Sequence, residues 1–345
     1  AHSVGVALAE EAIALREAGI EAPILMFTEP TEAAIEPLIA ADVTLALYRP
    51  DAITTATEAA RRIGGSVPVH LKVDTGMHRV GADPDDAVAL CESIVQSPGL
   101  RLEGLWTHFA VADDPGDSFT DDQLSRFAYV AAQLREVGIV PPVLHAANSA
   151  GAIAHPKSRF DLVRCGIASY GYAPSAKIAP VLSQEIEAVS PGDALRPVLS
   201  LKARVHLVRD LDAGERVSYG RTMPLPRHGR VAVVPLGYAD GLTRRLGSAG
   251  GEVLIGGKRR PICGTVTMDQ VIVNCGGDDI RVGDPVVLIG RQGGEEIMAD
   301  EWAERLGTIA YEVLCGIGSR VPRVARGRVA ANAEAPGEDA VAVRS

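Results

Sequence analysis

Long hydrophobic runs are missing from this sequence, because arginine, glutamate or glycine interrupts each apolar stretch well before the ~20 residues that a membrane-spanning helix needs. The five cysteines are scattered and include no C-x-x-C pair, a pattern that disfavours a zinc site or a disulfide framework and fits a reducing cytoplasm. Positive charge is also in deficit, and the formal net charge of −10 argues against nucleic acid as the main partner. We therefore expect a cytoplasmic protein with no membrane or nucleic-acid partner.

Lysine and clustered acidic ligands are scarce as well. No group of carboxylates has the spacing of a cation site, so we expect no bound metal. Length and apolar content are ample, because 345 residues with 47% hydrophobic side chains suit two domains with a sizeable core. The only lysines are Lys72, Lys157, Lys177, Lys202 and Lys258.

Strand-like and helix-like segments alternate through the first half of the chain, which predicts a parallel α/β sheet covered by helices. We count seven βα units, whereas a closed (β/α)8 TIM-type barrel needs eight. This half is therefore a doubly wound sheet, a barrel with one strand more than we count, or a barrel whose first strand lies upstream of Ala1. The expected strands are Val4–Leu8, Pro23–Phe27, Val43–Leu47, Val67–Val73, Leu102–His108, Val143–His145 and Asp161–Val163.

A different pattern begins after about Ser183, where short strands separated by glycine and aspartate turns predict a mostly antiparallel β domain. One helix is expected over Ala299–Leu306, continuing toward Thr308–Leu314. We expect a first domain over 1–190, a β domain over 191–326 and, because of its composition, a disordered tail over 327–345. The expected strands of the β domain are Leu199–Val208, Arg230–Pro235, Glu252–Ile255, Pro261–Cys263, Val271–Asn274 and Pro285–Ile289.

Residues with distinctive chemistry gather where the strands of the first half end, and the carboxyl ends of barrel strands form one face. Lys72, His108 and Arg164 lie at such ends, and Ser149 opens a short helix. A serine at a helix start is either an N-cap or part of a phosphate site built from free N–H groups. In the same way, His108 is either structural or catalytic, and Arg164 either forms a surface ion pair or meets a ligand.

Taken together, these segments resemble the alanine racemase family. The matches occur in family order across both expected domains, and their number makes the resemblance specific, although Tyr219 alone is more often a packed tyrosine and Met268 alone a core filler. The matching segments are Leu15-Arg-Glu-Ala-Gly-Ile-Glu-Ala-Pro-Ile-Leu25, Lys72–Gly81, Thr107-His108-Phe109, Asn148-Ser149-Ala150, Arg164–Gly171, Ser218-Tyr219-Gly220, Gly237-Tyr-Ala-Asp-Gly241, Met268-Asp269-Gln270, Gly307-Thr-Ile-Ala-Tyr311-Glu312 and Arg320-Val-Pro-Arg323.

The resemblance implies an enzyme that uses pyridoxal 5′-phosphate (PLP) to interconvert L-alanine and D-alanine, and that supplies D-alanine for cell-wall peptidoglycan. It also implies a PLP-binding (β/α)8 barrel, with its first strand missing here, followed by a β domain. Arg164 would face the pyridine nitrogen, which should stay unprotonated because arginine does not give up its proton. The implied phosphate ligands are Ser149, Gly166, Ile167 and Tyr311.

The acid and base groups also follow from the resemblance, because racemisation needs one group on each face of the substrate Cα. Tyr219 would serve one face and a lysine the other. A free tyrosine has a pKa near ~10, so it needs help to act near neutrality. The resemblance places His108 between Tyr219 and Arg164, in a positive chain that would favour the phenolate.

Substrate binding and assembly complete what the resemblance implies. Arg79 and Met268 would hold the carboxylate end of the substrate, and Asp269 would belong to the catalytic group. Lys72 is carbamylated in some family members, where it braces the arginine, and the same is expected to be feasible here. Because the family's equivalents of Tyr219 and Met268 enter the partner's active site, we expect an obligate homodimer.

One family element is absent, namely the lysine that binds PLP in a Lys-Ala-x-Ala-Tyr-Gly type motif on the first barrel strand. We expect the chain to be an N-terminally truncated racemase that is inactive alone. The alternative is a chain that starts near Ala1 and is a non-catalytic relic of a PLP site, but its open barrel would expose a long strand edge. Reading the coding sequence upstream of Ala1 separates the two explanations.

Three smaller departures from the family pattern are Cys165 in place of the usual proline, His78 in place of glycine, and Thr265 in place of arginine. Within PLP chemistry, a broad-specificity amino-acid racemase remains an alternative. A barrel-type amino-acid decarboxylase is disfavoured, because such enzymes usually place an acidic residue, rather than an arginine such as Arg164, at the pyridine nitrogen.

Overall fold

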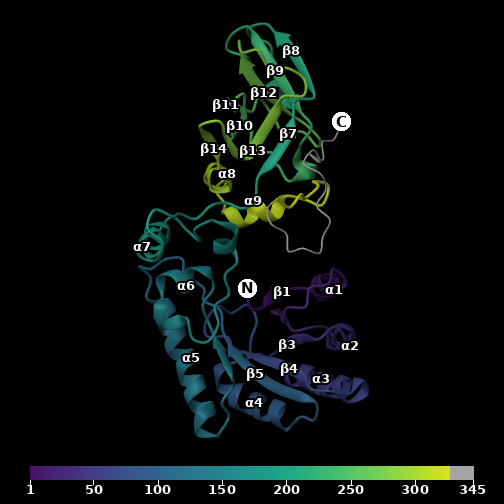
Figure 1. Cartoon of the computed structure of the whole chain (residues 1–345), viewed down its shortest axis with the longest axis vertical. Coiled ribbons are helices and arrows are strands. Elements are labelled where there is room, and N and C mark those ends of the chain that lie inside the picture. Colours follow the sequence, from purple (N-terminus) through teal and green to yellow (C-terminus); the bar gives the residue numbers. More distant parts are fainter. Residues whose placement is uncertain (327–345) are drawn as a thin grey trace. The chain divides into compact units, whose positions relative to one another are not determined.

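The computed structural model describes residues 1–326 of the chain (Figure 1). The chain folds as two compact units, the first formed by residues 1–169 and 173–195, the second by 170–172 and the chain from Arg196 onward. The tail that the sequence predicts to be disordered, 327–345, lies outside the described residues. Within 1–326, no helix is long and apolar enough to cross a membrane.

The first unit is built on a sheet of six parallel strands in the order β1-β2-β3-β4-β5-β6, the same order as in the sequence. This arrangement is an α/β half-barrel, and the carboxyl ends of all six strands lie along one edge. The strands are β1 (Val4–Val6), β2 (Ile24–Met26), β3 (Val43–Leu47), β4 (Val67–Lys72), β5 (Leu100–Trp106) and β6 (Val143–His145).

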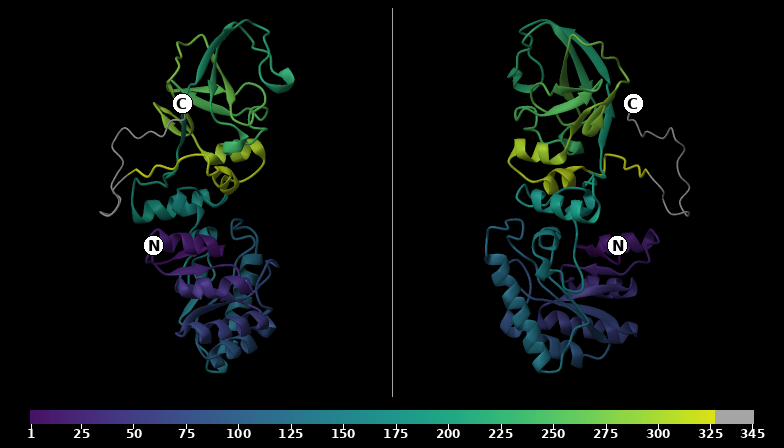
Figure 2. Two further views of the ribbon diagram at one scale, coloured as in Figure 1. Left: turned by 90° about the vertical axis from the view of Figure 1, so that its right-hand side faces the viewer. Right: turned by 60° about the vertical axis from the view of Figure 1, so that its left-hand side comes forward.

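Helices follow the strands and surround the outer face of the sheet (Figures 1 and 2). In α3, Pro50 occupies the first turn, where its missing N–H costs nothing, and Ile53, Ala56 and Ala60 recur at helical spacing on the buried face. The helices of this unit are α1 (Ala9–Glu17), α2 (Glu32–Ala40), α3 (Pro50–Ile63), α4 (Ala87–Gln96), α5 (Phe119–Glu136), α6 (Ser149–Ala154) and α7 (Ala179–Val189), with 3₁₀ turns η1 (Pro84–Asp86), η2 (Pro156–Ser158) and η3 (Ile167–Tyr170).

The seventh strand expected over Asp161–Val163 does not form, and that prediction was wrong. The segment runs beside β6, but only two backbone bonds join them, from Asp161 N to Leu144 O and from Arg164 N to Ala147 O. A single bridge between Asn148 and Arg164 replaces a ladder. The preceding Phe160 has φ of +35°, which turns the chain away from the extended conformation that a strand needs.

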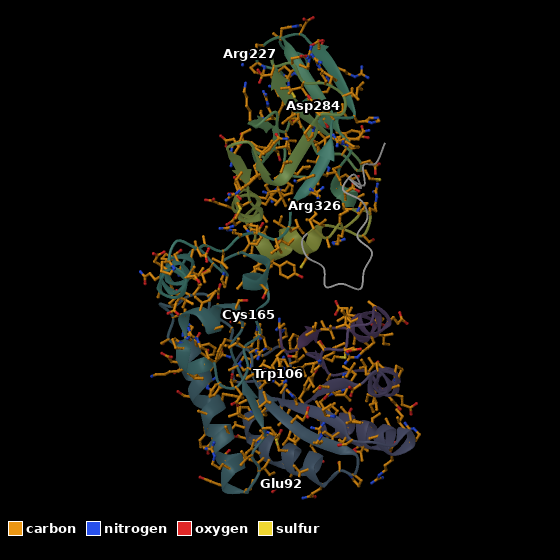
Figure 3. All side chains as sticks on the ribbon, in the orientation of Figure 1. Glu92, Trp106, Cys165, Arg227, Asp284 and Arg326 are labelled. Carbon is orange, nitrogen blue, oxygen red and sulfur yellow. The ribbon has the colours of Figure 1, made fainter. Side chains whose placement is uncertain are left out.

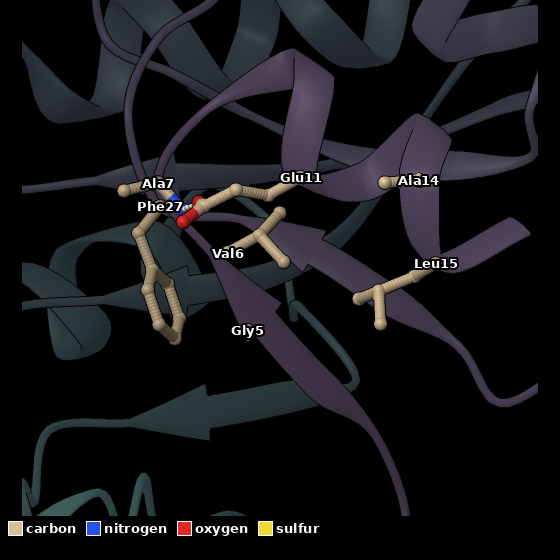
Figure 4. Close-up of a pocket in the computed structure, with 7 residues that line it drawn as sticks. All are labelled: Gly5, Val6, Ala7, Glu11, Ala14, Leu15 and Phe27. Atoms are coloured by element: carbon tan, nitrogen blue, oxygen red, sulfur yellow. Dashed lines mark hydrogen bonds between the residues drawn. The ribbon is translucent and has the colours of Figure 1, made fainter. Parts of the chain in front are cut away.

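The exposed edge strand β1 is covered on one side by α1, and the two enclose an open pocket of about 600 Å³ (Figure 4). Phe27 packs so closely on Gly5 that a Cβ there would lie 2.0 Å from its ring. The Glu11 carboxylate accepts hydrogen bonds from the N–H groups of Ala7 and Leu8, which fixes the start of α1.

The second unit is entirely antiparallel in its described strands. One sheet has the order β11-β10-β13-β14 with β7 also paired to β13, and a second sheet has the order β12-β9-β8. The elements are β7 (Leu201–Arg204), β8 (Leu207–Leu211), η4 (Tyr219–Arg221), β9 (Gly229–Val234), η5 (Tyr238–Asp240), β10 (Glu252–Ile255), β11 (Lys258–Pro261), β12 (Val271–Gly276), β13 (Pro285–Gln292), β14 (Glu295–Ile297), α8 (Ala299–Leu306) and α9 (Ala310–Gly316).

Two boundaries in this unit differ from the expectation. The single strand expected over Leu199–Val208 is split into β7 and β8, which pair in different sheets. The helix expected to continue past Leu306 instead ends there, because Gly307 takes a left-handed conformation (φ 72°, ψ 40°) and its N–H turns back to the helix. Helix α9 then starts afresh at Ala310.

Candidate active site

Three neighbouring strands of the first unit end in side chains that lie in one row. Lys72 at the end of β4 pairs in register with Trp106 of β5, which pairs in turn with His145 of β6. All three residues are buried. The imidazole of His145 stacks on the indole of Trp106, with 5.4 Å between ring centroids (Trp106 is labelled in Figure 3). The carboxyl edge of the half-barrel is therefore a packed cluster rather than an open channel.

Arg164 lies at the centre of this cluster. Its Nη1 is 2.8 Å from His145 Nδ1, and its Nη2 donates to the carbonyl oxygens of Thr107 and Ala146 at 2.8 and 2.9 Å. The guanidinium lies 4.8 Å from the centroid of Trp106. Burial lowers the pKa of Arg164 to about 9, so the group keeps its charge near neutrality. Among residues 1–326 no carboxylate forms an ion pair with it.

A second histidine, His70, continues the row of hydrogen-bonded side chains away from Arg164, because its Nδ1 lies 2.9 Å from His145 Nε2. A guanidinium can only donate, so His145 Nδ1 must accept, its Nε2–H must donate to His70, and both rings are neutral. Burial and the nearby charge of Arg164 lower the pKa of His70 to about 4 and that of His145 well below its usual range. Gly104 makes room for His70, since a Cβ there would lie 2.4 Å from the ring.

His108 joins the same group, with Nδ1 3.4 Å from Arg164 Nη2. Burial, followed by the charges of Arg164, Arg79 and Lys72, lowers its pKa to about 3, so it is a neutral imidazole near pH 7. Gln123 of α5 fixes the backbone here, because its amide nitrogen donates to the carbonyl of His108 at 3.1 Å. The expected contact of His108 with Arg164 is therefore present, but His108 itself adds no positive charge to it.

Lys72 has an unusual environment for a lysine. Its ammonium lies 4.5 Å from the centroid of Trp106. Burial first, and then the charges of Arg79 and Arg164, lower its pKa to about 8, although Asp74 acts in the opposite sense. The edge thus concentrates three cations without a paired carboxylate among the described residues, and such a site favours an anionic ligand.

The expected phosphate residues of this unit are brought together. Asn148, not Ser149, is the N-cap of α6, since its side chain accepts from Gly151 N at 2.9 Å. This leaves the Ser149 hydroxyl to accept from the N–H of Gly166 at 3.0 Å. Ile167 begins η3 directly afterwards. Gly166 has open space where a Cβ would be, which leaves its backbone approachable.

In the second unit, two side-chain hydrogen bonds hold the loop that carries Tyr219. Thr265, one of the departures from the family pattern, donates from its hydroxyl to the carbonyl of Tyr219 at 3.2 Å, and Ser218 donates to the carbonyl of Thr265 at 2.5 Å. Thr265 therefore supports the Tyr219 loop. The Tyr219 residue is 70% exposed and Met268 52% exposed, whereas Tyr311 on α9 is 38% exposed.

The expected site residues are thus divided between the units. Arg79, Lys72, His108, Ser149, Arg164, Gly166 and Ile167 lie in the first, whereas Tyr219, Met268, Asp269 and Tyr311 lie in the second. Sequence reasoning missed His70 and Trp106, and it noted His145 without a role. A signal was available for His145, since it ends a strand beside other chemically distinctive residues. A pocket of about 780 Å³ lies between the loop after β4 and α5, and its lining does not include the Arg164 cluster.

These features define an α/β half-barrel with a cation-rich carboxyl edge, followed by an antiparallel β unit. The family model for the N-terminal domain of alanine racemase matches residues 1–174, and that for its C-terminal domain matches residues 198–325. The chain therefore belongs to the alanine racemase family, whose members use PLP. The match begins at residue 1 and adds no support for a truncated chain, so that expectation stays a prediction.

Individual relatives agree with this assignment. An alanine racemase of Symbiobacterium thermophilum is 43% identical over 95% of this chain and 84% of its own length, and one of Treponema pallidum is 41% identical over 94% and 85%. A crystal structure of alanine racemase from Streptomyces lavendulae has a TM-score of 0.88 at 35% identity, covering 95% of this chain and 84% of that one. A histidine racemase from Leuconostoc mesenteroides has a TM-score of 0.84 at 30% identity, covering 94% and 84%.

Proposed function

We propose that this protein interconverts L-alanine and D-alanine with PLP, and that its product feeds cell-wall peptidoglycan. The observation that carries the proposal is Arg164, a partly buried guanidinium that the His145 ring and two carbonyl oxygens hold in place and that pairs with no carboxylate among residues 1–326. Such a group fits a ligand with a ring nitrogen acceptor and a phosphate nearby. It does not suit a cofactor site in which an acidic residue keeps the ring nitrogen protonated.

The residues present fit PLP in two further respects. The hydroxyl of Ser149 and the backbone at Gly166 and Ile167 meet at one place, where they would hold the phosphate together with Tyr311. When bound, PLP withdraws electrons from the substrate Cα and makes its proton easier to remove. Arg164 would direct its N–H to the ring nitrogen and keep a proton off that atom, because a guanidinium gives up no proton itself.

Proton transfer at the two faces of Cα falls to different parts of the chain. The Tyr219 phenol would give or take a proton on one face, near His108 and Arg164. Arg79 and Met268 would hold the substrate carboxylate, and Asp269 would belong to the catalytic group through its place next to Met268. Lys72 is suited to carbamylation, because burial and cationic neighbours favour its neutral amine, which can add CO2 with loss of one proton.

We further propose that the working enzyme is a cytoplasmic homodimer with shared active sites and that its first domain is a closed (β/α)8 barrel. High exposure of Tyr219 and Met268 supports the first point, because a catalytic tyrosine needs surroundings that exclude water. Two open strand edges, β1 and β6, support the second. The barrel strand that carries the PLP-binding lysine in the family has no counterpart motif in this sequence, so the 345-residue chain alone should bind PLP without turnover.

A chiral assay of alanine with added PLP tests the proposal. The protein expressed from its complete coding sequence should racemise L-alanine and D-alanine at comparable rates, while the 345-residue chain should show PLP binding by absorbance and no turnover. Serine, lysine and histidine serve as comparison substrates, the last because of the similarity to a histidine racemase. If any of these exceeds alanine in kcat/KM, the alanine assignment fails and a broad-specificity or histidine racemase takes its place.

A further inference from the structure

Three family-matching segments of the second unit meet around the corner Thr267–Gln270, which carries Met268. The N–H of Tyr238 donates to Thr267 O at 2.9 Å, and the N–H of Ala239 donates to Met268 O at 3.0 Å. Gly237 permits this approach, because a Cβ there would lie 2.3 Å from both carbonyl oxygens. The corner is therefore fixed to the turn η5 through its backbone. Its exposed end, which carries Asp269, is held by side-chain contacts.

Arg320 supplies that second attachment. Its Nη2 lies 2.7 Å from a carboxylate oxygen of Asp269, and its Nε lies 3.4 Å from Asp240. The Asp240 side chain is only 3% exposed and also accepts from Gly237 N at 2.9 Å, whereas the Asp269 side chain is 58% exposed. One guanidinium thus connects an exposed carboxylate on the corner to a buried carboxylate at the base of η5.

We propose that Arg320 is a positioning residue for the Thr267–Gln270 corner and that Asp269 acts as its anchor instead of exchanging protons with the substrate. The proposal rests on the proposed function only in assuming that Met268 meets the substrate. A guanidinium donates through separate nitrogens in one plane, so it can hold two carboxylates at a fixed distance, which a lysine ammonium does less well. The connection then sets where Met268 lies.

Amide hydrogen exchange of the full chain, without cofactor or substrate, tests the attachment directly. In Arg320→Gln, the amides of Tyr238 and Ala239 should exchange about tenfold faster, because the corner that accepts their hydrogen bonds opens more often. Exchange in the β9–β12 ladder should not change. Arg323→Gln is the matched control, because Arg323 lies on the same segment and donates to the carbonyls of Ile317 and Gly318 but, within residues 1–326, to no carboxylate.

Asp269→Asn provides a second variant that leaves the Arg320–Asp240 pair intact. It should reproduce the exchange effect, and the double variant should add little to either single change. Arg320→Lys should restore only part of the protection. Unchanged exchange in both Arg320→Gln and Asp269→Asn would overturn the proposal.

Kinetics of the active enzyme separate an anchor from a proton carrier. Asp269→Asn should raise KM for alanine several-fold and retain most of kcat, because only substrate placement is disturbed. A collapse of kcat with an unchanged KM and unchanged exchange would instead assign Asp269 to proton transfer. An absence of racemase activity in the unmodified enzyme would refute the proposed function and leave the exchange result unaffected.

Discussion

At the scale of single residues, the central feature is a positive charge surrounded by neutral imidazoles. Arg164 and His108 were predictable, because both match family segments and stand where the sequence predicts a strand to end. His70 and Trp106 were not, because they lie in stretches of β4 and β5 where successive residues are all buried, so no alternation of apolar and polar residues shows which side chains point to the site. Their roles depend on register between strands, which a single sequence does not specify.

The lowered pKa of His70 predicts a loss of stability in acid. Only the unfolded chain takes up the proton when the pH falls from about 6.5, its ordinary pKa, toward the folded value of about 4. The free energy of unfolding should therefore decrease through this window, by up to about 1.4 kcal/mol per pH unit for each such histidine. Urea unfolding at pH 6.5, 5.5 and 4.5 measures the slope.

The variant His70→Gln tests the source of that slope, because the glutamine carbonyl can still accept from His145 but does not titrate. Its slope should be smaller than that of the unmodified chain by roughly the share of one histidine. His228→Gln is the control, since His228 is an exposed histidine whose ring nitrogen lies 3.1 Å from a carboxylate oxygen of Asp212. Equal slopes in all three proteins would contradict the assignment.

At the scale of elements, local sequence signals predicted most strands and helices. They failed where contacts between distant segments determine whether a strand forms. The β6 strand matched its expected bounds, and Pro141 and Pro142 directly before it mark its start. The segment Asp161–Val163 is short and apolar like a strand, yet the positive φ of Phe160 turns the backbone out of the extended conformation. The side chain of Asp161, and not a backbone carbonyl, accepts the hydrogen bond from Leu144 N. The division of the expected strand into β7 and β8 was not predictable from the sequence, since it depends on which sheet each half joins.

Gly307 gives an element-scale prediction. It ends α8 in the left-handed region, and open space surrounds the place of a Cβ, so Gly307→Ala should cost only the conformational penalty of about 1–2 kcal/mol. Gly294→Ala is the matched control, because that glycine also has open space but no positive φ. Thermal unfolding should show a lower Tm for the first variant alone. A loss as large in the second would mean that strain at Gly307 is not the cause.

At the scale of the whole molecule, the segments that match the family lie in both compact units. The sequence predicted family segments in both halves, and that the two halves serve one site remains a proposal. The sequence did not predict which side chains stand exposed. Tyr219 and Met268 do, and the proposed homodimer gives each of them a partner site to enter.

Mixed dimers test that arrangement. Arg79→Ala and Tyr219→Phe should each abolish most racemase activity in the active enzyme while PLP stays bound. Because one heterodimer carries both defects in one site and neither in the other, co-expression should restore about a quarter of the activity if subunits mix at random. Activity no higher than that of the single variants, with mixed dimers present by mass spectrometry, would show that each site is made by one subunit.

Neither Arg164 nor Lys72 forms an ion pair with a carboxylate among residues 1–326, and this has a consequence for the life of the protein in the cell. An anion that binds the folded chain and not the unfolded one adds stability by mass action, about 2.7 kcal/mol at a concentration 100 times its Kd. Chains that meet the cofactor late therefore spend longer in a form that proteases can cut. Supply of the vitamin-derived cofactor would then set how much protein accumulates, as well as how much of it is active.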